Sequence, residues 1–260
     1  DMFVTPTTRI WKELYDQGKL NEAQRRFWEP KPPEELYDLS RDPDEIHNLA
    51  TSPAHQDVLK RLRKAQQDHA KEIRDVGFLP EAELHSRSKG STPYEMGRDP
   101  KKYPLERIMA AAEAASSLKP DAMPELLKAL NDSDSVVRYW AVMGILMRGE
   151  ETVKKQAPAL RKALSDVAPC VRIAAAEALG RYGTDEDARK SLAALMELAP
   201  ADKNGPFVSI LALNAIEALL PRIKPPKEAI AALPKSDPAS HPRANEEYVS
   251  RMIEAVLEKL

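Results

Sequence analysis

An internal repeat constrains the fold of this chain more than any other feature of its sequence. Residues 130–138 read LNDSDSVVR and residues 164–172 read LSDVAPCVR, an offset of 34 residues. A weaker third copy follows about 40 residues later, where residues 215–219 (AIEAL) echo residues 175–179 (AAEAL). Periods of this length are typical of helix pairs that stack on one another and share a continuous core. The sequence therefore predicts a solenoid built from helix pairs.

The second half of each copy carries the apolar pattern of a packed helix. In the second copy, apolar residues recur at the spacing i, i+3, i+4, i+7, i+8 and i+11, namely Val171, Ala174, Ala175, Ala178, Leu179 and Tyr182. The end of the chain repeats the pattern in Val249, Met252, Ile253, Val256, Leu257 and Leu260. Such a stripe covers one wide face of a helix. We therefore expect a mainly α fold in which residues 105–260 form an α-solenoid of helix pairs.

Composition excludes several other fold and function classes. Glycine is scarce, with 9 residues, and proline is abundant, with 22, which disfavours glycine-dependent nucleotide-binding folds and all-β folds. The net charge of −2 lacks the basic excess of a nucleic-acid-binding protein. No apolar run reaches the roughly 18 residues of a membrane span. The single cysteine, Cys170, cannot form an intramolecular disulfide or a multi-thiolate metal site. We expect neither a nucleic-acid partner nor a membrane span.

The first part of the chain differs in character from the repeats and is expected to form a subdomain. Residues 1–30 show two short helical segments, the first ended by Gly18 and the second begun by a capping box at Asn21. A short strand is expected at residues 36–39. The helix that begins at Pro53 is expected to turn four apolar side chains inward, namely Val58, Leu62, Ala65 and Ile73.

A segment rich in proline and glycine separates this subdomain from the repeats. Glycine or proline occurs every few residues from Gly77 to Pro104, and both residue types interrupt regular structure. We expect residues 77–104 to be loop-like and to link or wrap around the two parts. The predicted domains are therefore residues 1–76, the linker at residues 77–104, and the helical repeats at residues 105–260.

One segment of the first subdomain is similar to a known family. Residues 35–50 read ELYDLSRDPDEIHNLA. This resembles the C-terminal signature E-L-Y-D-L-x-x-D-P-x-E-x-x-N-L-A of the sulfatase family, and most of all its heparan N-sulfatase (sulfamidase)-type members. Residues 5–14 resemble the segment that precedes the signature in bacterial sulfatases, so the resemblance covers about residues 1–85. It implies a small antiparallel β-sheet with a packed helix at the N-terminal end of this chain, and a parent enzyme that is periplasmic or secreted.

The catalytic residues that the resemblance implies are missing from these 260 residues. Sulfatases use a formylglycine made from Cys or Ser in a C/S-x-P/A-x-R motif, and a Ca²⁺ ion held by Asp and Asn. After Cys170 the +2 position is Arg172 and the +4 position is Ala174, and the Asp-Asp pair of the family's metal site does not occur. We expect no catalytic, metal-binding or cofactor-binding residue here, and no activity from this chain alone. Because the chain opens at Asp1 without an initiator methionine, we expect a processed protein or a piece of a longer one.

Two further sets of residues are candidates for a role. Arg9 and Lys12 precede the sulfatase signature and are possible contacts to an anionic sugar, although surface ion pairs are the simpler interpretation. The repeats resemble HEAT-like repeats, in which an Asp-rich turn and a Val-Arg pair precede an alanine-rich helix; in the third copy Ala212 stands in the place of the arginine. That resemblance implies bonds between neighbouring units through four structural residues, Asp132, Arg138, Asp166 and Arg172.

Two functions remain open on these observations. The first is the non-catalytic C-terminal portion of a sulfatase that acts on sulfated glycans. Its partner would be the catalytic domain in cis, and its repeats would be an accessory module for a sulfated glycan or another protein. The parent enzyme would use Ca²⁺ and formylglycine, whereas this chain would hold no cofactor. The alternative is a stand-alone HEAT-like protein-binding scaffold with a degenerate sulfatase tail.

Overall fold

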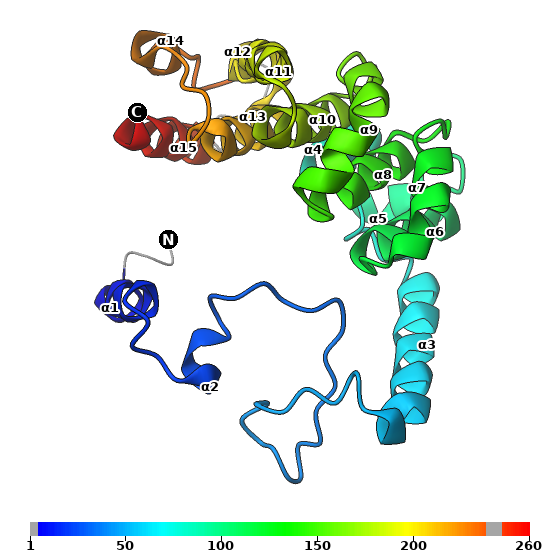
Figure 1. Cartoon of the computed structure of the whole chain (residues 1–260). Helices are drawn as coiled ribbons and strands as arrows, with labels where there is room; N and C mark the ends of the chain where they lie inside the picture. The colour runs from blue at the N-terminus through cyan, green and yellow to red at the C-terminus, as the bar shows by residue number, and fades with distance from the viewer. Residues whose placement is uncertain (1–4, 238–245) are drawn as a thin grey trace. The chain divides into compact units, whose positions relative to one another are not determined.

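The computed structural model describes residues 5–237 and 246–260, and all of the regular structure in these residues is helical. The chain divides into two compact units, residues 1–69 (unit 1) and residues 70–260 (unit 2). The boundary between them falls within helix α3 (Gln56–Ile73) (Figure 1). The mainly helical fold expected from the sequence is confirmed.

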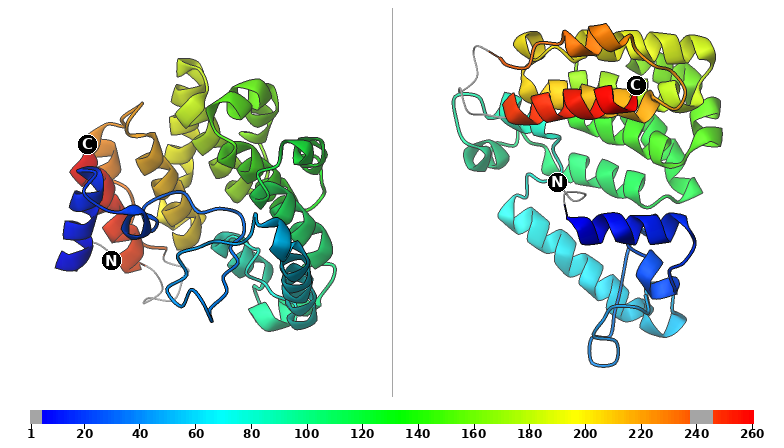
Figure 2. Two further views of the ribbon diagram at one scale, coloured as in Figure 1. Left: turned by 60° about the horizontal axis from the view of Figure 1, so that its bottom comes forward. Right: turned by 90° about the vertical axis from the view of Figure 1, so that its left-hand side faces the viewer.

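Unit 2 is built from two layers of helices, which Figures 1 and 2 show from three sides. Five helices pack one against the next in what we call the central row: α6 (Leu105–Ser116), α8 (Ser135–Met147), α10 (Pro169–Tyr182), α13 (Pro206–Leu219) and α15 (Glu246–Lys259). The flanking layer contacts this row through α7 (Met123–Ala129), α9 (Glu150–Ala163), α11 (Asp185–Leu198) and α14 (Lys227–Ala231). Because α8 and α10 begin 34 residues apart, the predicted repeat of helix pairs is confirmed.

The core of unit 2 follows the repeat. Ile145, Leu179 and Leu219 occupy the same place in three successive copies, and all three are fully buried. A glycine allows the second and third copies to approach closely, because a Cβ atom on Gly180 would lie 2.5 Å from Leu219 Cδ2. The composition of residues 201–206 (ADKNGP), which are inserted before the third copy, predicts a loop, but they contain the short helix α12 (Ala201–Asn204).

Capping residues fix where the repeat helices begin. The Asp134 carboxylate accepts hydrogen bonds from two backbone N–H groups in the first turn of α8. Helices α10 and α13 begin with Pro169 and Pro206, whose fixed φ suits the first helical position. Helix α11 begins with a capping box formed by Thr184 and Asp187. The turn chemistry at each copy therefore positions the helices that the apolar stripes then pack together.

The segment 77–104 is not the loop that its composition suggests. It forms two short helices, α4 (Glu81–Arg87) and α5 (Pro93–Arg98). Thr92 caps α5, with a proline at the first helical position, so proline here starts a helix instead of interrupting one. Leu79 and Met96 belong to the same buried cluster as Ile108 of α6. The segment therefore packs as part of unit 2.

Unit 1 begins with two helices joined by a tight turn, α1 (Pro6–Asp16) and α2 (Glu22–Arg25). Gly18 ends the turn after α1 with a φ of 67°, a left-handed conformation that glycine adopts without strain. The Asn21 side chain accepts the Gln24 N–H, and the Gln24 side chain accepts the Asn21 N–H. This capping box and the glycine stop are confirmed predictions. Residues 26–52 contain no helix, and a 3₁₀ turn (Pro53–His55) then leads into α3.

The prediction of a small antiparallel sheet at this end of the chain is wrong. The described residues contain no strand, including at the expected positions Leu36, Tyr37 and Leu39. The Leu49 N–H does donate to the Leu36 carbonyl, at 2.7 Å. The neighbouring bonds, however, go to a side chain: Asn48 Oδ1 accepts the Leu36 N–H at 3.0 Å, and Asn48 Nδ2 donates to the Glu34 carbonyl at 3.2 Å. One amide side chain thus replaces the ladder of bonds that a second strand would supply.

Helix α3 also presents its apolar residues differently from the expectation. Its buried hydrophobic residues are Leu59 and Ala70. The residues expected to face inward are exposed instead, namely Val58, Leu62, Ala65 and Ile73. They recur at helical spacing, so they form an open apolar stripe along the helix. The pattern predicted the stripe correctly, but the burial of the stripe depends on a surface that the described part of the chain does not place over it.

Candidate functional site

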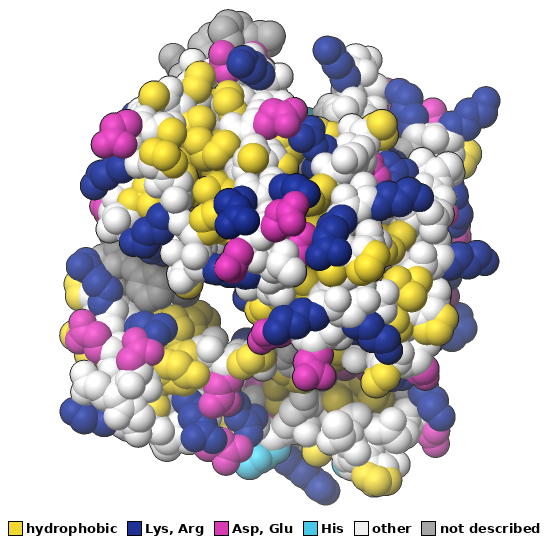
Figure 3. All heavy atoms as spheres, turned by 45° about the horizontal axis from the view of Figure 1, so that its top comes forward, with side chains coloured by type: hydrophobic (Ala, Val, Ile, Leu, Met, Phe, Trp, Pro, Cys, Tyr) yellow, Lys and Arg dark blue, Asp and Glu magenta, His cyan; other side chains and the backbone are white. Residues whose placement is uncertain are grey.

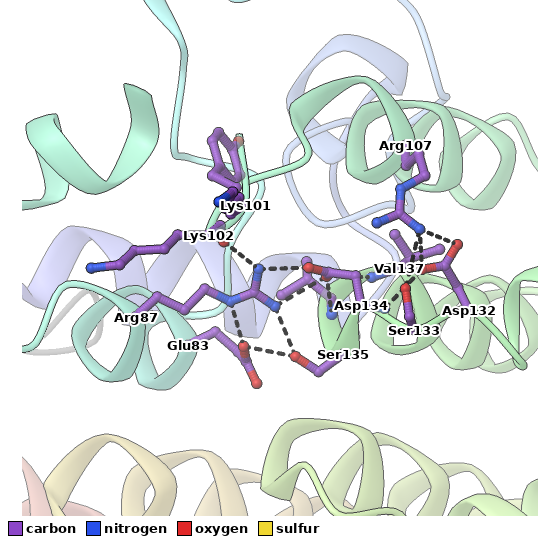
Figure 4. Close-up of polar contacts among 12 residues, drawn as sticks. Glu83, Arg87, Lys101, Lys102, Arg107, Asp132, Ser133, Asp134, Ser135 and Val137 are labelled. Carbon is purple, nitrogen blue, oxygen red and sulfur yellow. Dashed lines mark hydrogen bonds and ion pairs between the residues drawn. The ribbon is translucent and has the colours of Figure 1, made fainter. Parts of the chain in front are cut away.

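A dense polar cluster lies where α4 meets the amino-terminal ends of α8 and α10. Arg87 of α4 donates to both carboxylate oxygens of Asp134, at 2.8 and 3.0 Å, and to Ser135 Oγ at 2.8 Å (Figure 4). It also donates to Glu83 Oε2 at 2.8 Å. We call this group of five residues the α4 clamp: Glu83, Arg87, Asp134, Ser135 and Cys170.

The α4 clamp positions charge but offers no reactive group. Ser135 Oγ and Cys170 Sγ both donate to Glu83, at 2.8 and 3.4 Å. Burial opposes the ionisation of Asp134, but hydrogen bonds from Arg87 and from the first turn of α8 hold the pKa of its carboxyl below the ordinary value. Burial, with Glu83 beside it, raises the pKa of the Cys170 thiol. A thiol that stays protonated is a poor nucleophile, so this cluster serves to hold α4 in place.

Helix α4 and the residues before it make further contacts with the central row. The His85 ring stacks on Phe207 of α13, with centroids 4.0 Å apart and planes 9° apart. Trp140 of α8 donates its indole N–H to the Phe78 carbonyl at 2.9 Å. This segment therefore contacts α8, α10 and α13 in their amino-terminal halves.

The residues predicted to bond between repeat units lie in ion pairs. Arg138 of α8 holds Asp166 with two bonds of 2.7 Å, and both side chains are 13% exposed. Burial opposes the ionisation of Asp166, but Arg138 and the Ala168 N–H hold the pKa of its carboxyl below the ordinary value. Arg107 of α6 donates through one nitrogen, Nη1, to both carboxylate oxygens of Asp132, at 2.7 and 2.9 Å. Both ion pairs join one helix pair of the solenoid to the next.

The arginine contact changes from copy to copy. Arg172, the repeat equivalent of Arg138, donates to Glu197 at 2.9 Å and to the Leu164 carbonyl at 3.3 Å. The Glu197 side chain is 67% exposed, so this pair is more hydrated than the one in the preceding copy. In the third copy Ala212 cannot form any such contact. The contact made at this arginine position therefore differs in each of the three copies.

The sulfatase-like signature in unit 1 uses its polar side chains to hold its own backbone. Asp42 accepts the N–H groups of His47 and Ile46, at 2.7 and 3.0 Å, and these bonds lower the pKa of its carboxyl. Asp38 accepts the N–H and the hydroxyl of Ser40, at 3.1 and 2.6 Å. Local bonds of this kind define the shape of the turn, which is a structural role.

The two predicted substrate-side residues lie on α1. Lys12 forms an ion pair with Asp16, and its ammonium lies 5.5 Å from the centroid of the Tyr15 ring and 5.9 Å from that of Trp28. Arg9 is exposed. These residues belong to unit 1, whereas the structural repeat residues belong to unit 2.

A groove that the sequence did not indicate lies beside the carboxyl-terminal end of α13. It has a volume of about 610 Å³ and is lined by α13, the turn after it and α15, including Asn214, Glu217, Ala218, Pro221, Lys224 and Lys259. Lys259 forms an ion pair with Glu217, and Lys224 donates to the carbonyl oxygens of Lys259 and Leu260, at 3.3 Å each. The available sequence signal was a lysine shortly after the apolar stripe of α13 and another at the end of the stripe of α15.

The surface is mixed in charge. Figure 3 shows a face on which Lys and Arg side chains are interspersed with Asp, Glu and hydrophobic ones. Within residues 5–237 and 246–260, no three His, Cys, Asp or Glu side chains are grouped so that they could hold a metal ion. In the same residues, no helix is long and apolar enough to cross a membrane. The groove beside α13 and the exposed apolar side chains are therefore the features of the described residues that could contact a ligand or another protein.

Comparison with known proteins identifies the repeats and one relative. A family model of HEAT repeats matches residues 123–217, so the chain contains HEAT repeats. The chain is also similar to an "Ulvan-active sulfatase" of Formosa agariphila, with 41% identity over 98 residues. That match covers 37% of this chain but only 16% of the relative, so the chain spans a small part of that protein's length. No solved structure matches.

Proposed function

We propose that this chain is the non-catalytic C-terminal portion of a sulfatase, with the HEAT repeats as an accessory module. The observation that carries the proposal is the 41% identity to the Formosa agariphila sulfatase over 98 residues. The resemblance of residues 35–50 to the sulfatase signature also supports it. The likeness of these residues to heparan N-sulfatase (sulfamidase)-type members extends the proposed reaction to sulfamates as well as sulfate esters, on sulfated glycans.

The apolar surface of unit 1 supports a partner domain. Five of its large hydrophobic side chains are 37–60% exposed: Ile10, Phe27, Leu39, Val58 and Leu62. Its buried hydrophobic residues, by contrast, are Leu36 and Leu59. Val58 and Leu62 lie one turn apart on α3, and an exposed apolar helix face of this kind can mark a contact with another surface. A catalytic domain in cis would be that surface.

The same partner would cover α3, which carries an open apolar stripe along its length. The Leu36 segment is already held by the side chain of Asn48, so the cover is proposed for the helix alone.

The chemistry would reside in that catalytic domain. The described residues offer no group of ligands for the Ca²⁺ ion, and Cys170 lies outside any C/S-x-P/A-x-R motif. Formylglycine and Ca²⁺ would therefore be held elsewhere in the parent enzyme, which would be periplasmic or secreted. We assign no catalytic step to this chain. Its repeats would contact a sulfated glycan or another protein.

The alternative of a stand-alone protein-binding scaffold has less support. Such a scaffold would need the central row open along its length. Helix α4 instead occupies the amino-terminal ends of three row helices, through the α4 clamp and the stacking of His85 on Phe207.

The coding DNA upstream of Asp1 gives the most direct test. The expected result is a continuing reading frame that encodes a C/S-x-P/A-x-R motif and an Asp-Asp pair. A start codon or a signal-peptide cleavage site immediately before Asp1 would overturn the proposal. Assayed with an aryl sulfate, the purified chain should show no metal-dependent turnover, and measurable turnover would contradict the assignment of the chemistry to another domain.

A substitution on α3 tests the covering domain. In the isolated chain, Leu62→Asn should change the free energy of unfolding by less than about 0.5 kcal/mol, as at other surface sites. In the complete enzyme it should cost about 1–3 kcal/mol, because the amide would then be buried without a matched partner. Lys60→Asn, on the exposed polar side of the same helix, is the matched control and should be silent in both proteins. Equal costs for Leu62→Asn in the two contexts would exclude a cover over α3.

A further inference from the structure

The segment between α11 and α13 contains an asparagine that differs from all the others in this chain. Of the six asparagines, only Asn204 is followed by a glycine, within residues 201–206 (ADKNGP). Glycine has no Cβ atom to shield its backbone nitrogen or to restrict its dihedral angles. The nitrogen of Gly205 can therefore reach the side-chain carbonyl carbon of the preceding asparagine more easily than the nitrogen of another residue could.

Helix α12 holds this pair of residues in an unreactive geometry. The Gly205 N–H donates to the Ala201 carbonyl at 2.9 Å. The Asn204 amide donates to the carbonyls of Glu197 and Pro200, at 3.1 and 3.2 Å. Both the attacking nitrogen and the amide that would leave are therefore engaged in hydrogen bonds while the helix is intact, so a reaction between them requires the helix to open.

The barrier to opening is low, because α12 is a single helical turn. Its 4 residues are far fewer than a helix needs to be stable by itself in water. Its one buried residue is Ala201, and the bond from the Lys203 N–H to the Pro200 carbonyl is long, at 3.4 Å. A segment with so few buried contacts opens locally at a much smaller cost than the whole fold.

The surroundings of Gly205 leave room for the reaction. Its φ is 78°, and a Cβ atom placed on it would meet a single atom of the described residues, Asp237 Oδ2, at 4.0 Å. Asn204 is partly exposed, and Asp202 and Lys203 beside it are exposed. Water therefore reaches the pair, and no packed side chain blocks the closure of a ring.

We propose that Asn204 is a modification site, gated by the opening of α12, at which ammonia is lost and an aspartate or an isoaspartate is formed. The Gly205 nitrogen gives its proton to the solvent, forms a bond to Asn204 Cγ and displaces Nδ2, which takes up a proton and leaves as ammonia. Water then opens the cyclic imide. Cleavage of the new Cγ–N bond gives aspartate, and cleavage of the original peptide bond gives isoaspartate. The sum is one water consumed and one ammonia released, without oxidation or reduction.

Either product would keep α12 open. A carboxylate at position 204 has no N–H to donate to the Glu197 and Pro200 carbonyls, and it would meet their partial negative charge at the end of α11. Isoaspartate would also lengthen the backbone by one carbon. The first turn of α13 follows directly, and its Phe207 stacks on His85 of α4. The modification would therefore loosen the contact between α13 and α4.

Incubation of the whole 260-residue chain in mildly alkaline buffer, followed by peptide mapping with mass spectrometry, tests the site. The peptide that contains Asn204 should gain the mass difference between an amide and an acid, and electron-transfer fragmentation should identify isoaspartate in part of it. Asn131 is the internal control, because it is exposed but followed by Asp132, and it should remain an amide. An unchanged Asn204, or equal conversion at Asn131, would overturn the proposal.

A pair of matched variants tests the gate. Lys203→Gly should speed the conversion of Asn204 about fivefold, because glycine destabilises a helix and the open fraction rises in proportion. Lys155→Gly makes the same change inside α9 and should leave the rate unchanged. In the urea-unfolded chain both variants should react like the parent chain and faster than the folded chain, since no helix remains to open. An equal rate in the folded and unfolded parent chain would show that α12 is not a gate.

A variant that imitates one product tests the consequence. The Ser209 N–H donates to the Gly205 carbonyl at 3.1 Å in the first turn of α13, so its hydrogen exchange reports on that turn. Asn204→Asp should speed this exchange, whereas Asn131→Asp, which adds the same charge elsewhere, should not. Unchanged exchange in Asn204→Asp would show that α13 does not depend on α12. None of these measurements involves sulfatase activity, so their outcome is independent of the proposed function.

Discussion

All but two of the buried hydrophobic residues in the described chain lie in unit 2, whereas unit 1 buries only Leu36 and Leu59. In unit 2, equivalent apolar positions in successive helix pairs are buried in a series of hydrophobic clusters along the repeats. In unit 1, the signature segment is held by side chains such as Asp42 and Asn48, which bond to backbone groups. The two units of one chain thus rely on different kinds of contact.

This difference shows what each kind of sequence pattern encodes. A helical repeat contains both partners of every apolar contact, because each copy supplies the surface that the next copy covers. The signature defines the path of the backbone but leaves large side chains such as Leu39 and Leu62 exposed. A unit of this kind has a specified local shape but buries few hydrophobic side chains of its own.

The largest effect should come from the shared core of the repeats. Leu179→Ala removes a side chain that is fully buried between helix pairs, and it should lower the free energy of unfolding by about 2–5 kcal/mol. Urea denaturation followed by far-UV circular dichroism measures the change. The control is Leu39→Ala in unit 1, where the side chain is 60% exposed, and its cost should stay within about 0.5 kcal/mol. Similar costs for both variants would erase the distinction between the units.

The second-largest loss of stability should come from breaking the Arg138–Asp166 ion pair between the first two repeat copies. Asp166→Ala leaves Arg138 largely buried without its partner, and it should cost about 2–3 kcal/mol. Replacing both members, as Arg138→Met with Asp166→Leu, should recover most of that loss, since neither charge then has to be desolvated. The equivalent Arg172–Glu197 pair is more exposed, so Glu197→Ala should lower the free energy of unfolding by less than about 1 kcal/mol. If Glu197→Ala cost as much as Asp166→Ala, burial would not be what distinguishes the two copies.

Acid should destabilise unit 2, because its arginine-bonded carboxylates become protonated. Hydrogen bonds from Arg161 lower the pKa of the buried Asp187 carboxyl, and the pKa values of Asp134 and Asp166 are also lowered. A carboxyl whose pKa is lower in the folded state stabilises the fold above its unfolded pKa of about 4, and that stability is lost as the pH falls below it. The urea midpoint should therefore hold steady from about pH 7 to 5 and decline below about pH 4. Asp187→Asn should make the decline shallower, and an unchanged slope would remove Asp187 from this role.

The sequence was sufficient where both partners of a contact lie in one periodic pattern. The equivalent positions Ile145, Leu179 and Leu219 are buried because each faces a neighbouring copy of its own helix pair. The start of α2 was also predictable, because the Asn21 capping box joins residues only three positions apart. Local and periodic signals of this kind determine most of the helices of unit 2 and the first turn of unit 1.

The sequence was insufficient where the partner is distant and not periodic. Arg87 of the short helix α4 bonds to Asp134, 47 positions away, and Glu83 accepts a bond from Cys170, 87 positions away. No spacing rule connects such residues, so the composition of residues 77–104 predicts a loop where the structure has α4 and α5. The predicted strand at Leu36 failed for a related reason, because a strand exists only with a second strand beside it. The groove near Lys224 likewise depends on how α13 and α15 meet.

The smallest effect concerns the polar bonds that replace core contacts in unit 1. Asn48→Ala removes the acceptor of the Leu36 and Ala50 N–H groups and should weaken this turn by about 1 kcal/mol. Amide hydrogen exchange at Leu36 and Ala50 should then become roughly fivefold faster, with little change in the amides of α10. His47→Ala, which alters an exposed side chain in the same turn, should leave that exchange unchanged. Continued protection of the Leu36 amide in Asn48→Ala would show that backbone pairing, not one amide side chain, holds the segment, and the contrast between the two units would then be smaller than their burial suggests.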